Sequence, residues 1–122
     1  MALGWSTTEA NEAIDALLAS YTWVKLHTGD PGAAGTANAA SNTTRKQATW
    51  SAASSGASSN TGTLTWTSVP ASEDYTHFSL WTASTAGTFG FSGTVTANAV
   101  TTGDTFTIAT GDLDIVAGNI AA

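Results

Sequence analysis

Apolar and polar residues alternate along most of this chain, a pattern typical of strands that bury one face. In the run Thr63-Leu64-Thr65-Trp66-Thr67, two large apolar side chains stand on one side and three threonines on the other. The run Asp104-Thr105-Phe106-Thr107-Ile108 repeats this arrangement. β-Branched and aromatic residues also favour extended backbone. The pattern predicts about seven short strands, at residues 21–28, 45–52, 63–69, 75–83, 88–96, 105–110 and 113–117.

One segment before the strands has the spacing of a helix. Ser6-Thr7-Thr8-Glu9 matches the capping box, in which the Ser hydroxyl and the Glu carboxylate each accept a hydrogen bond from a backbone N–H at the helix start. Behind it, apolar residues recur at helical spacing and form a single stripe: Ala10, Ala13, Ile14, Leu17 and Leu18. The sequence therefore predicts an amphipathic helix at residues 6–20.

Together these elements predict a mainly β fold, an antiparallel β-sandwich of about seven short strands preceded by one N-terminal amphipathic helix. A chain of 122 residues has the size of a single domain. We divide it into an N-terminal arm (1–5), the helix (6–20), the sandwich (21–117) and a C-terminal tail (118–122). Two loops, at 29–44 and 53–62, consist mainly of Gly, Ala, Ser, Asn and Thr and offer no apolar anchor. Tight turns are expected at Gly87 and Gly111.

Charge is sparse, and its sign narrows the choice of partners. Only 10% of the residues are charged, against roughly a quarter in an ordinary soluble domain. Nine carboxylates against Lys25, Arg45 and Lys46 give a net charge of −6, so the chain lacks the basic surface that nucleic-acid binding requires. The first residues have neither a basic n-region nor a long apolar run. We expect no direct nucleic-acid contact, no membrane insertion and synthesis in the cytoplasm.

Candidate catalytic and metal-binding residues are few. The Gly-x-Ser-x-Gly nucleophile motif is absent, and we predict no enzyme activity, no catalytic residue and no cofactor. There is no Cys, and neither His27 nor His77 has a second His at i+2 or i+4, so zinc is not predicted. Both histidines are expected to be packed or hydrogen-bonded. Asp104, Asp112 and Asp114 have the oxygen chemistry of a calcium site; the alternative is a solvated acidic patch.

The five tryptophans are the side chains best suited to anchor a partner. Trp66 and Trp81 align with apolar neighbours and are expected in the interior. Trp23 stands on the opposite side of its strand from Val24 and Leu26, which makes it a candidate for an interface. Trp50 fits either role. An exposed indole beside polar groups can also stack on a sugar ring, which would suit a protein that contacts glycans.

Further apolar residues occur near the two chain ends. Leu3 and Trp5 precede the helix, and Ile120 lies in the tail. An apolar arm can dock on a neighbouring subunit, and burying a Trp there contributes roughly 1.5–3 kcal/mol. For Trp5 the alternative is a hydrophobic staple against Ala10. The candidate partner interface comprises Leu3, Trp5, Trp23, Trp50 and Ile120.

Four segments resemble one protein family. Residues 21–32, Tyr-Thr-Trp-Val-Lys-Leu-His-Thr-Gly-Asp-Pro-Gly, resemble the Leu-His-Thr-x-Asp-Pro-Gly opening of small bacteriophage virion proteins known as tail-fibre or minor tail proteins. Residues 45–50, 76–81 and 103–113 are similar to three further segments of that family, with Lys46 inserted beside Arg45 and Ser79 where a Gly is common. The resemblance implies a β-sandwich component of a phage particle. Similar folds also serve as capsid decoration.

The sequence therefore predicts a non-enzymatic bacteriophage virion structural protein. The leading hypothesis is a capsid decoration (cementing) protein on the outer surface of the head, because few residues follow the last predicted strand and none form a fibrous shaft. The alternative is a tail-fibre or tail-tip module that contacts host-surface glycan. Expected partners are the major capsid protein or other virion proteins, and further copies of the chain, with a trimer as the suggested homo-oligomer. The expected location is the exterior of the virion.

Overall fold

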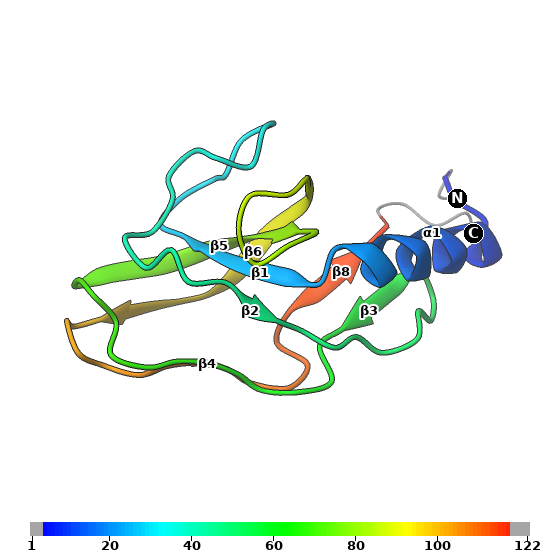
Figure 1. Cartoon of the computed structure of the whole chain (residues 1–122). Helices are drawn as coiled ribbons and strands as arrows, with labels where there is room; N and C mark the ends of the chain where they lie inside the picture. The colour runs from blue at the N-terminus through cyan, green and yellow to red at the C-terminus, as the bar shows by residue number, and fades with distance from the viewer. Residues whose placement is uncertain (1–3, 118–122) are drawn as a thin grey trace.

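The computed structural model describes residues 4–117 and shows a helix followed by short antiparallel strands (Figure 1). The elements in chain order are α1 (Thr7–Ser20), β1 (Trp23–His27), β2 (Lys46–Gln47), β3 (Ala57–Ser59), β4 (Leu64–Trp66), β5 (Glu73–Trp81), β6 (Phe89–Val100), β7 (Phe106–Ile108) and β8 (Asp114–Val116). The predicted fold class, mainly β with one leading helix, is confirmed.

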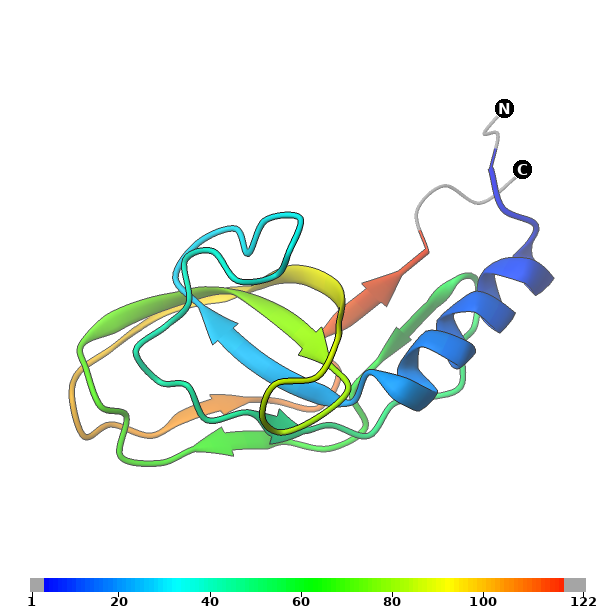
Figure 2. The same cartoon turned by 45° about the horizontal axis from the view of Figure 1, so that its top comes forward.

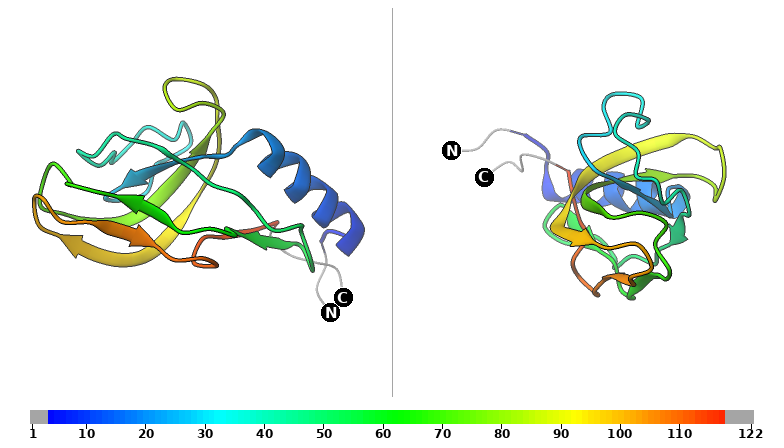
Figure 3. Two further views of the ribbon diagram at one scale, coloured as in Figure 1. Left: turned by 60° about the horizontal axis from the view of Figure 1, so that its bottom comes forward. Right: turned by 90° about the vertical axis from the view of Figure 1, so that its left-hand side faces the viewer.

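The largest sheet has four antiparallel strands in the order β2-β1-β5-β6. Leu26 pairs with Phe78, and Leu80 pairs with both Val24 and Phe91, so that one face of this sheet is apolar across three strands. The β4–β7 pair lies across from that face, and Figures 2 and 3 show the two layers from different sides. The β3–β8 pair continues beyond the layers toward α1.

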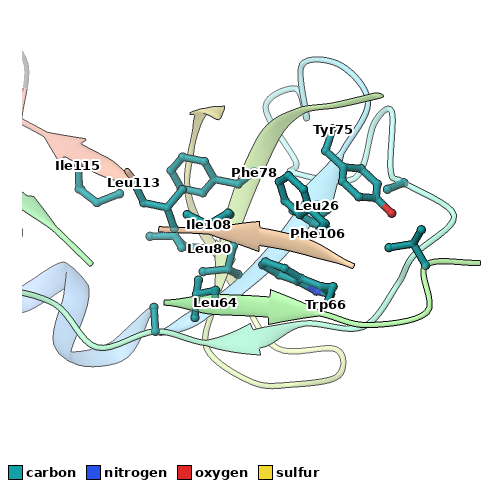
Figure 4. Close-up of a cluster of buried hydrophobic side chains, with 14 of the residues drawn as sticks. Leu26, Leu64, Trp66, Tyr75, Phe78, Leu80, Phe106, Ile108, Leu113 and Ile115 are labelled. Carbon is teal, nitrogen blue, oxygen red and sulfur yellow. The ribbon is translucent and has the colours of Figure 1, made fainter. Parts of the chain in front are cut away.

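The hydrophobic core fills the space between the two layers (Figure 4). Leu64 and Trp66 on β4 point toward it, as do Phe106 and Ile108 on β7. The rings of Trp66 and Phe106 lie 5.8 Å apart, and Tyr75 meets Phe106 edge-on at 4.9 Å. Aromatic pairs in such tilted or edge-on arrangements contribute beyond their buried area. The predicted alternation on these strands is therefore the alternation of core and surface.

Helix α1 begins as the sequence predicts. Ser6 Oγ accepts a hydrogen bond from the Glu9 N–H at 3.2 Å, which is one of the two bonds of a capping box. Ala10, Ile14 and Leu18 form the buried stripe. The polar side also holds a loop, because Asp15 Oδ1 accepts a hydrogen bond from the Ala53 N–H at 2.8 Å. The 53–62 loop is thus held by hydrogen bonds to α1, which also include the Gly56 N–H to Asn11 Oδ1, and by Ala53, which packs against the core.

Two sequence predictions need correction. The strand expected at 45–52 is reduced to β2 and an isolated bridge between Trp50 and Asn60. The loop expected at 53–62 contains β3, whose residues pair with β8 from Ala57↔Val116 to Ser59↔Asp114. Hydroxyl bonds supply what apolar residues do not, since the buried Ser58 donates to the Ser51 carbonyl at 2.6 Å. The turns at Gly87 and Gly111 are confirmed by positive φ angles of 78° and 85°.

Candidate interaction surface

The four-stranded sheet has a second face, opposite the core, which we call the outer face. Cross-strand partners project to the same side of a sheet. The outer face consists of Trp23, Lys25 and His27 on β1 and of their partners Trp81, Ser79 and His77 on β5. Three of the four motif segments contribute to this face. Segments 21–32 and 76–81 supply its strand residues, and segment 45–50 supplies Arg45, which lies over Trp81.

A buried polar network fastens the 29–44 loop to the outer face. His27 and Ser79 are both fully buried. His27 Nδ1 lies 2.9 Å from the Ala37 carbonyl oxygen, and His27 Nε2 lies 2.7 Å from Ser79 Oγ. Ser79 Oγ also accepts the indole N–H of Trp81 at 2.7 Å. Because a carbonyl only accepts, Nδ1 carries the proton, and in the neutral ring Nε2 accepts the Ser79 hydroxyl proton.

The surroundings of His27 favour its neutral form. Burial lowers the pKa of His27 below its ordinary value, and the positive charge of Lys25 acts in the same direction. The hydrogen bond to the Ala37 carbonyl opposes this shift without cancelling it. A neutral His27 satisfies every polar atom in the chain from Trp81 to Ala37, which fits a structural role for the motif histidine.

The His27–Ser79 contact has the composition of a nucleophile and base but not the accessibility. Neither side chain has exposed surface, and the group that orients the imidazole is the Ala37 carbonyl in place of a carboxylate. The Ser79 oxygen is already an acceptor for Trp81. A substrate has no route to this hydroxyl in the folded protein. The other histidine, His77, is half-buried and bonds to Thr76 at 2.8 Å.

Two cations stack on the indole of Trp81. The Arg45 guanidinium lies 4.5 Å from the ring centroid, and Lys25 Nζ lies 5.8 Å from it, within the range of a cation–π interaction. Arg45 Nη1 also donates to the carbonyls of Ala83 and Ala86, at 2.8 and 2.7 Å. Arg45 therefore clamps the hairpin between β5 and β6 while covering Trp81. Burial, and then the nearby Arg45, lowers the pKa of Lys25.

The structure places the predicted interface residues on separate elements. Trp23 is half-buried on the outer face. Trp5, before α1, is 44% exposed, which leaves its docking role a prediction. Leu3 and Ile120 lie outside the described residues. Val116 on β8, 49% exposed, is a large apolar surface residue absent from the predicted interface; it projects to the side opposite the buried Ile115. Trp66 and Trp81 are buried as predicted, Trp66 in the core and Trp81 on the outer face.

Trp50 lines an open groove of about 670 Å³ between α1 and the segment after β2. The groove combines apolar side chains with an amide, a carboxylate and hydroxyls. Its lining includes Asp15, Thr22, Gln47, Thr49, Trp50 and Ser51. The indole ring is half-buried, and within the described residues its buried N–H has no hydrogen-bond partner.

The three aspartates considered for calcium do not form a site. Within residues 4–117, no group of three or more His, Asp or Glu side chains is close enough to hold a metal ion. Asp104 instead accepts the Thr101 N–H at 2.9 Å and closes the turn before β7. Asp112 and Asp114 lie exposed on either side of the buried Leu113.

Comparison with known proteins agrees with the motif resemblance. A family model described as "Podophage GP4 fiber I protein gp80" matches residues 4–116. The chain belongs to this family. It is thus a phage fibre-type protein, and the match spans the outer face, the core and α1. No curated protein matches the sequence. In this fibre-family chain, no helix of the described part is long and apolar enough to cross a membrane.

Proposed function

We propose that this protein is a non-catalytic structural subunit of a phage virion and belongs to its fibre apparatus. The observation that carries the proposal is the family match over residues 4–116. The outer face supports it, because the most reactive pair of side chains there, His27 and Ser79, is buried and holds a loop in place. The remaining surface is mostly small and uncharged, which suits contact with neighbouring proteins.

The family match changes our preference between the two placements weighed from the sequence. Head decoration was the leading hypothesis, whereas the matched family is described as a fibre protein. We therefore favour the fibre. Its partners in this proposal are other virion proteins and further copies of the chain, with the major capsid protein as the competing partner. The site of action is the exterior of the particle.

Electron microscopy of purified particles carrying a tagged copy of this protein tests the placement. We expect label confined to fibres, at a low copy number per particle. Label spread over the head in hundreds of copies would overturn the fibre placement and restore head decoration. The absence of the protein from purified particles would overturn the structural role itself.

Contact with host-surface glycan is a second candidate function, and the Trp50 groove is the observation that favours it. An indole face beside amide, carboxylate and hydroxyl groups offers both stacking and hydrogen bonding to a sugar ring. A glycan array with the wild type, Trp50→Ala and Trp50→Phe tests this function. Saturable binding that is lost with Ala and retained with Phe supports it. No binding by the wild type, or binding indifferent to both substitutions, rejects the groove as a sugar site.

A further inference from the structure

The positive charge of this acidic protein is concentrated on one part of the sheet. Lys25, on β1, and Arg45, just before β2, lie over the same Trp81 ring. The third cation, Lys46, follows Arg45 directly in the chain but pairs with Val24, which places its side chain on the opposite side of the sheet from Lys25. The nine carboxylates are distributed over the rest of the sequence. Lys25 and Arg45 therefore give the outer face a local positive charge on a molecule with a net charge of −6.

Within residues 4–117, no carboxylate contributes to the pKa shift of either cation over Trp81. The pKa of Lys25 is lowered by burial and by Arg45, and burial alone lowers that of Arg45. An adjacent carboxylate would act in the opposite direction for both groups. The role of Arg45 is explained by its bonds to the Ala83 and Ala86 carbonyls. Lys25 contacts the Trp81 ring, and it lies close to a like charge there.

The shape of this surface favours a protein partner over a small ligand. Lys25, Arg45 and Trp81 do not line the Trp50 groove, nor the grooves beside Phe106 and beside Trp66. These side chains instead lie on the outer face, where Trp81 is buried and the two half-buried cations lie beside the half-buried Trp23. Such a face is complementary to a protruding acidic element.

Helix α1 of a second copy is an acidic element of this kind. Glu9, Glu12 and Asp15 lie on its exposed side, away from the buried stripe. Several other carboxylates already cap backbone N–H groups of their own loops, namely Asp30, Glu73 and Asp104. Asp15 accepts the Ala53 N–H and so holds the 53–62 loop. Glu9 and Glu12 are the two carboxylates of α1 that remain for a contact with another copy.

We propose that copies of this protein associate head to tail, with the Lys25–Arg45 surface of one copy docking on the acidic side of α1 of the next. The two surfaces belong to different elements, so the contact is heterologous. A heterologous contact forms a closed ring or an open filament, depending on the rotation between copies. The proposal goes beyond a fibre role, because it assigns the contact that joins one copy to the next.

Charge reversal with rescue tests the contact. Analytical ultracentrifugation at low ionic strength should show that the wild type self-associates. Lys25→Glu and Glu12→Lys should each weaken association about tenfold or more, because each places like charges opposite one another. A mixture of the two variants should recover association, because each supplies the surface that the other has lost. Arg45 is left unchanged because it also clamps the hairpin.

Asp114→Lys is the matched control, since it makes the same change in net charge on exposed β8. It should neither weaken association comparably nor restore association to Lys25→Glu. Far-UV circular dichroism of each variant verifies that it is folded, and Lys25→Gln provides a milder second variant.

Three outcomes would overturn the proposal. They are a wild type that stays monomeric at low salt, single reversals without effect, and rescue by Asp114→Lys in place of Glu12→Lys. A monomeric protein that nevertheless labels fibres in the microscope would reject this contact and leave the proposed function intact.

Discussion

At the scale of single residues, Ser79 joins two structural units. Its hydroxyl receives the Trp81 indole N–H and donates to the imidazole of His27, which in turn holds Ala37 of the 29–44 loop. All the polar atoms of this chain of bonds are satisfied only while the serine is present. Removing the single oxygen atom of Ser79 should therefore disturb both the Trp81 indole and the attachment of the 29–44 loop.

Replacing Ser79 with Ala should destabilise the protein by about 2–3 kcal/mol, because it leaves the Trp81 N–H and His27 Nε2 buried without partners. Urea unfolding followed by tryptophan fluorescence measures the change. Ser92→Ala is the control, since Ser92 pairs with Ser79 across the strands and is only half-buried. Its expected cost is below about 0.5 kcal/mol. Equal costs for the two variants would contradict the network.

His27 should make stability depend on pH. Its pKa in the folded protein is lowered, mainly by burial, so the unfolded chain binds a proton more readily. The stabilisation is therefore fully present above the unfolded pKa of about 6.5 and is lost as pH falls from there through the folded value. Urea unfolding between about pH 8 and pH 5 should show this decline, and His27→Gln should remove it. An NMR titration that places the His27 pKa at or above its ordinary value would contradict the prediction.

At the scale of elements, the loops are held to the sheet by specific contacts of backbone and charged groups. Gly35, in the 29–44 loop, has a φ of +73°, and a Cβ placed there would overlap the Phe89 ring on β6. Arg45 closes the β5–β6 hairpin through two carbonyls. These contacts add to the few apolar anchors of the loops: in the 29–44 loop, contrary to the sequence expectation, Ala40 reaches the core and Pro31 is buried.

Gly35→Ala should cost about 2–4 kcal/mol, from backbone strain and from the displaced Phe89 ring. Gly103→Ala is a matched control, because Gly103 also has a positive φ, of +91°, but has no atom within 4 Å of the added Cβ. It should cost only the backbone strain, about 1 kcal/mol. The difference in unfolding free energy between Gly35→Ala and Gly103→Ala isolates the contact with Phe89. Equal costs for the two variants would show that the Phe89 ring moves aside without a cost in stability.

Arg45→Lys should loosen the β5–β6 hairpin although it keeps the charge. A lysine ammonium lacks the planar guanidinium that stacks on Trp81 while binding two carbonyls. Amide hydrogen exchange in residues 82–88 should accelerate about tenfold, as expected if the clamp holds the hairpin by about 1.4 kcal/mol. Lys46→Arg serves as control, and exchange unchanged in Arg45→Lys would show that the hairpin is held by its strands alone.

Prediction from sequence succeeded where a strand alternates and failed where polar contacts define the element. Leu64 and Trp66, and likewise Phe106 and Ile108, are buried as the period-2 pattern requires. Strand β3 has no such signal, because backbone pairing and the Ser58 hydroxyl hold it. The bond between His27 and Ser79 joins residues 52 positions apart, which no local pattern reports. The only hint in the sequence was that His27 and Ser79 lie in two motif segments of the same family.

At the scale of the whole molecule, repulsion between like charges opposes folding of the monomer, whereas attraction between opposite charges favours association of copies. Nine carboxylates against three cations give a net charge of −6, so repulsion between charges outweighs attraction in the folded monomer. Folding brings these charges closer, so screening by salt favours the compact state. Salt weakens association through opposite charges, because it screens their attraction.

Raising NaCl from about 20 mM to about 500 mM shortens the Debye length from roughly 20 Å to roughly 4 Å. At pH 7 this should raise the urea midpoint of unfolding slightly, by several tenths of a kcal/mol in free energy. The same change should dissociate head-to-tail assemblies. Urea unfolding at low protein concentration and ultracentrifugation at high concentration measure the two responses. A midpoint that falls with salt would indicate that attractive pairs dominate the monomer.

The attachment of the 29–44 loop has one more consequence. His27 binds a main-chain oxygen, that of Ala37, and the neighbouring Ala33, Ala34 and Thr36 are exposed. The anchor thus recognises the path of the loop and is indifferent to the side chains that the loop displays. Foreign sequences can replace these positions while Gly35 and the carbonyl at 37 are kept, so this loop is a suitable place to insert a peptide without disturbing the anchor.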